Sequence, residues 1–258
     1  ADTQAQAVSI NTYPDSHAPL IREALEADCH VFVEKPLATT VEAAQELVGL
    51  AKEKGKILMV GYILRVHPAW GRFVEMARKL GKPLVMRMNL NQQSSGLQWH
   101  THKQLMKSMS PIVDCGVHYV DIMCMMTESR PISVNAIGAR LTDEIPEGMY
   151  NYGQLQVRFE DGSVGWYEAG CGTMMSETAF FIKDVIGHGG SVSISEYPEE
   201  GSDHIEGHTK TGVLQRHYNI VDGQGRFLHP DAFIQIEEEP DHDGLCLLEQ
   251  ESFLSAIR

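Results

Sequence analysis

A lysine at the end of an apolar segment is the first residue whose position suggests chemistry. Lys35 follows the run Val31–Val33, comes directly after Glu34 and precedes Pro36. The run is typical of a buried strand, and the proline ends the strand and favours an extended conformation at the residue before it. A lysine at the carboxyl end of a parallel strand can hold a hydroxyl or carbonyl oxygen of a substrate, and Glu34 can tune its charge and direction. The alternative is a salt-bridged surface turn.

An aspartate and a histidine form the second candidate group. Asp114 and His118 are four residues apart and His118 precedes Asp121 by three, so the spacing predicts that they share a helix face. A carboxylate beside an imidazole fixes its tautomer and raises its basicity, which is how a general base is paired with the group that orients it. The alternative is a helix capped by Asp114, with His118 as a hydrogen-bonded core residue.

The elements that must position Lys35 alternate between strand and helix over residues 7–61. Because parallel strands need crossover helices of this length, the alternation predicts a parallel sheet. Thr39 or Thr40 is the expected N-cap of the second helix, and Gly55 its end. The predicted strands are Val8–Ile10, His30–Val33 and Ile57–Val60, and the predicted helices are Pro19–Ala27 and the segment from Thr40.

The rest of the chain is predicted to form a mostly antiparallel sheet, with helices over Pro68–Leu80 and near Val117–Met126. Glu160–Ser163 has the composition of a hairpin turn. We place the domain boundary near Gly81–Pro83, which gives domains 1–82 and 83–258. The fold class is therefore α/β followed by α+β. The predicted strands are Val85–Leu90, Ile132–Ile137, Gly153–Phe159, Val164–Glu168, Phe180–Val185, Val192–Ile194 and one near Gly212–Tyr218.

Composition narrows the possible partners. The 258 residues carry a formal net charge of −14 and are 43% hydrophobic, so the chain can bury a sizeable core. An acidic chain without a lysine- or arginine-rich run argues against a nucleic-acid or membrane partner. The odd number of scattered cysteines, five, indicates reduced thiols and a cytoplasmic location.

Four segments together resemble the Gfo/Idh/MocA oxidoreductase family. They are Ser9–His17, Glu34-Lys35-Pro36, Gly61–Arg65 and Asp114–His118, and the resemblance covers nearly the whole chain. It implies a Rossmann domain that binds NAD or NADP, followed by a domain with a large open sheet. It also implies a sugar, inositol or related polyol substrate and a homodimer or homotetramer.

The resemblance implies roles for individual residues. Lys35 would contact substrate and nicotinamide, His118 would be the acid/base, and Asp114 would bind substrate or orient His118. Trp99 and His100 lie in a predicted loop of the kind that lines the substrate pocket, where Trp99 can stack on a sugar. The residues expected to border the cofactor are Asn11, Thr12, His17, Glu34, Lys35, Pro36 and Arg65.

The sequence departs from the family pattern in one respect. It contains no G-x-G-x-x-G, the turn that holds a dinucleotide pyrophosphate, so we expect a fragment that carries the second half of the Rossmann domain and the start of the last helix. No metal site is predicted. The pair His100/His102 has no third partner, and Gly201 and Gly207 favour a solvated loop at His204 and His208.

These observations predict an oxidoreductase that transfers a hydride between NAD or NADP and a sugar or polyol. Two alternatives remain open. The first is a redox-neutral relative that keeps its NAD bound, such as a glycosidase or an epimerase. The second is a non-catalytic sugar-binding or oligomerisation subunit, which would account for the missing glycine turn but does not require Lys35, Asp114 and His118.

Overall fold

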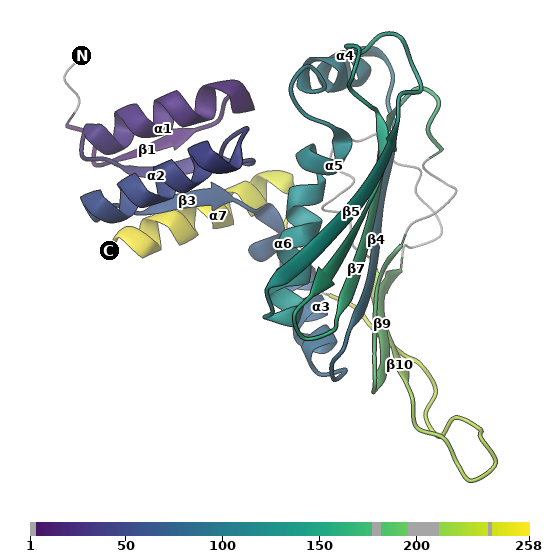
Figure 1. Cartoon of the computed structure of the whole chain (residues 1–258). Helices are drawn as coiled ribbons and strands as arrows, with labels where there is room; N and C mark the ends of the chain where they lie inside the picture. The colour runs from purple at the N-terminus through teal and green to yellow at the C-terminus, as the bar shows by residue number, and fades with distance from the viewer. Residues whose placement is uncertain (1–3, 177–181, 196–211, 237–238) are drawn as a thin grey trace. The chain divides into compact units, whose positions relative to one another are not determined.

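The chain folds into two compact units. The computed structural model describes residues 4–176, 182–195, 212–236 and 239–258. Residues 1–63 and 241–258 form the first unit, and residues 64–240 form the second. Figure 1 traces the chain through both, and each unit is described by itself below. None of the helices in the described ranges is long and apolar enough to cross a bilayer.

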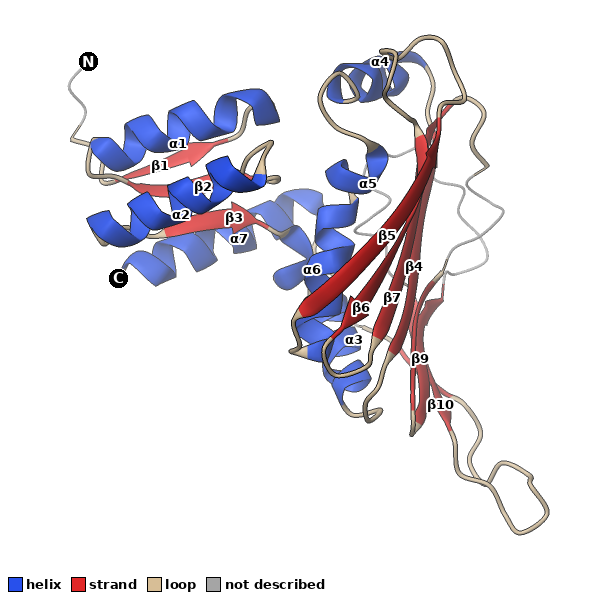
Figure 2. Cartoon of the chain, in the orientation of Figure 1, coloured by secondary structure: helices blue, strands red, loops and turns tan. Residues whose placement is uncertain are grey.

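The first unit is a small parallel sheet with helices on its faces (Figure 2). Its strands are β1 (Ala7–Ile10), β2 (His30–Glu34) and β3 (Leu58–Gly61), hydrogen-bonded in that order. Both strand pairs are parallel, as the alternation of strand and helix predicts. The helices are α1 (His17–Glu26), α2 (Val41–Lys54) and α7 (His242–Ile257).

Side-chain alternation along β2 divides the first unit into two layers. Val31 and Val33 pack with residues of α1 and α2 in one buried apolar cluster. Phe32 points the other way, because successive strand residues face opposite sides of a sheet. Its ring lies 6.0 Å from that of Phe253 on α7. The sheet is therefore covered on one face by α1 and α2 and on the other by α7.

Local signals set the ends of α2 as the sequence predicts. The Thr40 hydroxyl accepts a hydrogen bond of 3.2 Å from the Ala43 N–H, which makes Thr40 the N-cap. Gly55 follows the helix in the left-handed conformation, with φ of 64°. A glycine adopts this conformation without the steric cost that other residues meet, so it ends the helix.

The second unit is built on one large sheet. Over the described residues the strand order is β11-β10-β9-β8-β4-β7-β6-β5. Only the β4–β7 pair is parallel among these neighbours. The strands are β4 (Val85–Gln93), β5 (Pro131–Ala139), β6 (Tyr152–Phe159), β7 (Val164–Gly172), β8 (Lys183–Gly187), β9 (Gly190–Ser195), β10 (Val213–Tyr218) and β11 (Ala232–Ile234).

The second unit also holds four helices in its described part: α3 (Pro68–Arg78), α4 (Gly96–Leu105), α5 (Pro111–Asp114) and α6 (Gly116–Thr127). The predicted turn at Glu160–Ser163 joins β6 to β7, with Gly162 at φ of 86°. The predicted strand Phe180–Val185 is observed from Lys183; its first two residues, and His204 and His208, lie outside the described residues.

The division into units differs from the predicted boundary at Gly81–Pro83 in two places. Helix α3 packs against α6 and against strands β8 and β9, which assigns it to the second unit. Helix α7 packs on β2, which returns residues 241–258 to the first unit. Both assignments depend on contacts between segments far apart in the chain, and helical periodicity carries no information about them.

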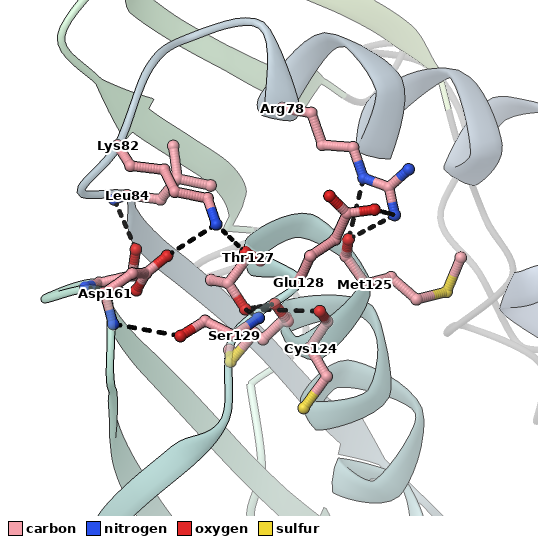
Figure 3. A network of polar contacts seen from close by, with 11 residues as sticks. Arg78, Lys82, Leu84, Cys124, Met125, Thr127, Glu128, Ser129 and Asp161 are labelled. Atoms are coloured by element: carbon pink, nitrogen blue, oxygen red, sulfur yellow. Dashed lines mark hydrogen bonds and ion pairs between the residues drawn. The ribbon is translucent and has the colours of Figure 1, made fainter.

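The carboxyl end of α6 forms hydrogen bonds and ion pairs with neighbouring elements, as Figure 3 shows. The Arg78 guanidinium donates hydrogen bonds of 3.0 and 2.7 Å to the carbonyl oxygen of Met125. Lys82 donates to the carbonyl of Thr127 and forms an ion pair of 3.0 Å with Asp161. These cations satisfy carbonyl groups that a helix end leaves without partners, so they hold α6 in place.

Candidate active site

The turn after β2 places Lys35 at the carboxyl edge of the parallel sheet, as the sequence predicts. Its backbone N–H donates to the Glu34 carboxylate over 3.3 Å, and the side chain of Lys35 is half-buried. Gly61 of β3 lies opposite Glu34 in the strand register. A Cβ atom at Gly61 would lie 3.3 Å from a Glu34 carboxylate oxygen, so the glycine leaves room for that carboxylate.

His17 braces this turn and is not exposed to a ligand. Its side chain is 0% exposed. The Nδ1 atom lies 2.7 Å from the carbonyl oxygen of Pro36, and the Nε2 atom lies 3.0 Å from that of Thr12. The imidazole thus ties the segment after β1 to the segment after β2, at the edge that carries Lys35.

The segment after β1 is exposed. Asn11 donates a hydrogen bond of 3.1 Å to the hydroxyl of Ser9, and the Thr12 hydroxyl accepts one of 2.7 Å from Ser16. Both side chains therefore lie at the same sheet edge as Lys35 and are accessible to a ligand. Their predicted contact with a cofactor stays a prediction.

The predicted helix through Asp114 and His118 is broken into two. Asp114 ends α5, whose N-cap is Ser110, and α6 begins after Cys115. The prediction of Asp114 as an N-cap is therefore wrong, because Ser110 and Pro111 begin a separate short helix before it. His118 lies in the first turn of α6 and is 2% exposed.

Asp114 lines a pocket of about 250 Å³, part of it open to solvent. The other polar side chains that line the pocket are Gln92 from the end of β4, His102 from α4 and Ser110. Amide, hydroxyl and carboxylate groups in one hollow can bind the hydroxyl groups of a polyol. Sequence reasoning did not identify Gln92, because it reaches the pocket only through the pairing of distant elements. Ser110 is local to Asp114, as the N-cap of the short helix that Asp114 ends.

Cys171, which lines the pocket, and the tyrosines Tyr119 and Tyr167 are held in their neutral forms by burial, which does not suit an acid/base or a nucleophile. Burial, with a smaller contribution from Asp114, raises the pKa of Cys171 to about 12. Burial also raises the pKa of Tyr119 and of Tyr167 well above its usual range. The Tyr119 ring on α6 and the Tyr167 ring on β7 stack with their centroids 4.6 Å apart, so both phenols pack between helix and sheet as neutral groups.

The sequence predicts a loop around Trp99, and this prediction is wrong, because the segment forms helix α4. Trp99 is 6% exposed and packs with Met106 and Ile145, while its indole N–H donates to Glu144 over 3.2 Å. Its ring is therefore a packing element and not an open platform for a sugar. His100 is exposed in a separate hollow of about 660 Å³, which shares no lining residue with the pocket beside Asp114.

Arg65 is bound to α6. Its guanidinium donates two hydrogen bonds, of 2.7 and 2.6 Å, to the two carboxylate oxygens of Asp121. Paired contacts of this kind are the strong form of an arginine–carboxylate interaction. Asp121 lies one turn after His118, so the pair anchors the segment after β3 to the helix that carries the histidine.

The described residues fit one end of a dinucleotide cofactor. The carboxyl edge of an open parallel sheet is where such ligands bind, and Lys35 supplies a cation there. The segment Asn11–Ser16 before α1 contains no glycine, and α2 follows Thr40, so no glycine-rich turn precedes a described helix of the first unit. The described part of the first unit therefore offers a cation at this edge but no glycine-rich turn for a dinucleotide pyrophosphate.

Two family models match the chain. Residues 1–62 match the oxidoreductase family with an NAD-binding Rossmann fold, and residues 76–193 match the GFO/IDH/MocA C-terminal domain.

Curated relatives include two sugar or inositol enzymes. The chain is 29% identical over 142 residues to UDP-N-acetylglucosamine 3-dehydrogenase of Acidithiobacillus ferrooxidans. The aligned region covers 55% of this chain and 42% of that protein. It is 29% identical over 203 residues to scyllo-inositol 2-dehydrogenase (NAD(+)) of Bacillus subtilis, covering 75% and 56%. The chain thus spans about half the length of these relatives.

Solved structures share the fold. That of the A. ferrooxidans enzyme superposes with a TM-score of 0.70 at 21% identity, covering 98% of this chain and 69% of that chain. GenD2 from gentamicin A biosynthesis, solved in complex with NAD, gives 0.70 at 19% identity, covering 98% and 68%. At these identities the likeness shows the fold alone.

Proposed function

The chain belongs to the GFO/IDH/MocA family of oxidoreductases, and on that premise we propose that it transfers a hydride between NAD or NADP and a sugar, inositol or related polyol. Support comes from the curated relatives, which are named as dehydrogenases of a sugar nucleotide and of an inositol. The carboxylate of Asp114, the amide of Gln92 and the hydroxyl of Ser110 in the small pocket are groups that can bind hydroxyl groups of a substrate.

The roles assigned to the side chains follow from their chemistry. In the direction of oxidation, His118 takes the proton of the substrate hydroxyl, and a carbonyl forms as hydride leaves the same carbon. Lys35 holds the reacting oxygen and stabilises the negative charge that develops on it. Asp114 orients His118 or binds a neighbouring hydroxyl. The cofactor, when bound, supplies the hydride acceptor.

The single observation that carries this proposal is the pair of family matches, over residues 1–62 and 76–193, because together they include Lys35, Asp114 and His118. The residues that brace them support the same assignment: His17 holds the turn at Lys35, and Arg65 is bound to the helix of His118.

The first test is turnover on a panel of sugars and polyols with NAD and NADP. We expect Lys35→Ala and His118→Ala each to lower kcat by about 100-fold or more, the usual contribution of a positioned acid/base, with unchanged circular dichroism. Arg130→Ala is the matched control, since Arg130 forms only an exposed ion pair with Glu160. Wild-type turnover in both test variants would contradict the assignment.

The redox-neutral alternative predicts cofactor that stays bound and no net NADH. The binding-subunit alternative predicts sugar affinity without dinucleotide affinity. Calorimetric titration with the dinucleotide and with the sugar separates these outcomes from the dehydrogenase.

We also propose a homodimer or homotetramer in the cytoplasm. The edge strand β5 is exposed along most of its length, and such an edge is one that a second copy can cover. The five cysteines are free thiols, which suits a reducing compartment. A light-scattering mass equal to one chain would contradict the oligomer.

A further inference from the structure

One face of β2 presents a carboxylate toward α7. Phe32 and Glu34 lie two residues apart and therefore share a face of the strand. On α7, Glu249 and Phe253 are four residues apart and share a face of the helix. The ring contact of 6.0 Å between Phe32 and Phe253 fixes the register of these two faces. Glu249 is thereby placed at the level of the carboxyl end of β2, where Glu34 lies.

Glu249 is buried, which is unusual for its residue type. Its side chain is 5% exposed, and α7 otherwise buries only Leu245 and Phe253. Burial, and then the charge of nearby Glu34, raises the pKa of Glu249 to about 8. Among the described residues, Glu34 on β2 is the charged group that acts on Glu249. A buried glutamate is retained at a cost, because its charged form is poorly solvated.

Glu34 lies between β3 and the turn that carries Lys35. It is accommodated by Gly61, because a Cβ atom there would lie 3.1 Å from the Phe32 ring and 3.3 Å from the Glu34 carboxylate. The carboxylate also accepts the backbone N–H of Lys35 over 3.3 Å. A charge at Glu249 therefore acts on a carboxylate that is hydrogen-bonded to the residue Lys35 itself.

We propose that Glu249 is a positioning residue for Lys35, acting through Glu34. The inference rests on the proposed function, which makes Lys35 the group that holds the reacting oxygen. At neutral pH a protonated Glu249 adds no negative charge to that of Glu34. As Glu249 loses its proton, a second negative charge appears next to Glu34, which repels that carboxylate and stabilises the ammonium form of Lys35.

The test is the amine reactivity of Lys35, measured by competitive labelling and mass spectrometry of the whole chain. Only the neutral amine reacts, so an added nearby carboxylate slows labelling. We expect Glu249→Gln to label at the wild-type rate at about pH 6, where Glu249 is protonated in the parent. At about pH 9 we expect the variant to label about threefold faster, which corresponds to about half a pKa unit at Lys35.

Two further variants control for charge and for helix packing. Glu251→Gln removes the same charge from an exposed position of α7 and is expected to leave Lys35 labelling unchanged at both pH values. Glu249→Asp keeps a carboxyl group and is expected to retain the slow labelling at about pH 9. The deciding quantity is the Lys35 labelling rate of Glu249→Gln divided by that of the wild type. If this ratio is one at both pH values, or differs from one by the same factor at both, the positioning role is overturned.

If Glu249→Gln does not fold, as judged by circular dichroism, the wild-type chain decides. Above about pH 8, the labelling rate of Lys35 in the wild type should fall below the curve expected for a single ionising group. A rate that follows the single-group curve at every pH overturns the inference. Labelling requires neither cofactor nor turnover. The positioning role and the dehydrogenase proposal therefore fail in different experiments, the second in the turnover assay of Lys35→Ala.

Discussion

At the scale of single residues, buried polar groups near the sheet edge control the turn that carries Lys35. The ring of His17 links two backbone carbonyls at that edge, and the Glu34 carboxylate is accommodated by Gly61. Glu249 adds the group whose charge changes in the accessible pH range. The same group that influences Lys35 must therefore also influence the stability of the fold.

Glu249 should make the chain less stable as pH rises. Folding raises its pKa from about 4.5 to about 8, so between these values the folded chain holds a proton that the unfolded chain has released. The stability that the protonated carboxyl contributes is complete below about pH 4.5 and is lost by about pH 8, at most about 1.4 kcal/mol per pH unit.

Glu249→Gln removes this dependence. The unfolding free energy of the variant minus that of the wild type should increase by about 1–3 kcal/mol from about pH 5 to about pH 9. Urea unfolding at the two pH values measures the gain. Identical pH dependence in the two chains would show that Glu249 does not titrate as described.

At the scale of elements, the position of α6 is set by contacts at its middle and at its end. At its middle, the Arg65–Asp121 pair attaches the segment after β3. At its end, Glu128 adopts the left-handed conformation, and Arg78 reaches from α3 to the Met125 carbonyl and to Glu128 (Figure 3). His118 is thus carried by a helix that two ion pairs hold against its neighbours.

Arg78→Ala should loosen α6. The variant loses two hydrogen bonds to one helix-terminal carbonyl and an ion pair of 3.1 Å, and because the arginine is partly exposed we expect a cost of about 1 kcal/mol. Arg72→Ala is the control on the same helix, since Arg72 pairs only with Glu75 within α3. It should cost less than about 0.5 kcal/mol. Equal losses in chemical denaturation would contradict the anchoring role.

Local patterns predict the elements whose own residues determine them. The apolar run before Lys35, the Thr40 cap and the Gly55 end are all local, and each is confirmed. Helix α4 is not predicted because Ser95 makes no side-chain cap and the helix begins at Gly96, so its start carries no strong signal. It is held by tertiary packing of Trp99, which periodicity does not register.

At the scale of the whole molecule, contacts between distant segments decide what the sequence leaves open. Helix α7 joins the first unit because Phe253 packs on Phe32, and this brings Glu249 to Glu34. In the second unit, Gln92 and Ser110 meet beside Asp114 only through the sheet and helix arrangement. The pattern of motifs predicts the fold class and the chemistry, whereas the supporting groups require the tertiary structure.

The most direct test of the proposed activity is the fate of the hydrogen on the reacting carbon. A polyol found in the turnover panel is labelled with deuterium at the carbon to be oxidised, and the reduced cofactor is examined by NMR. We expect one deuterium on the nicotinamide ring for each carbonyl formed, and no transfer with His118→Ala. Deuterium released to water, or a changed sugar with no net reduced cofactor, would contradict a dehydrogenase and favour the redox-neutral relative.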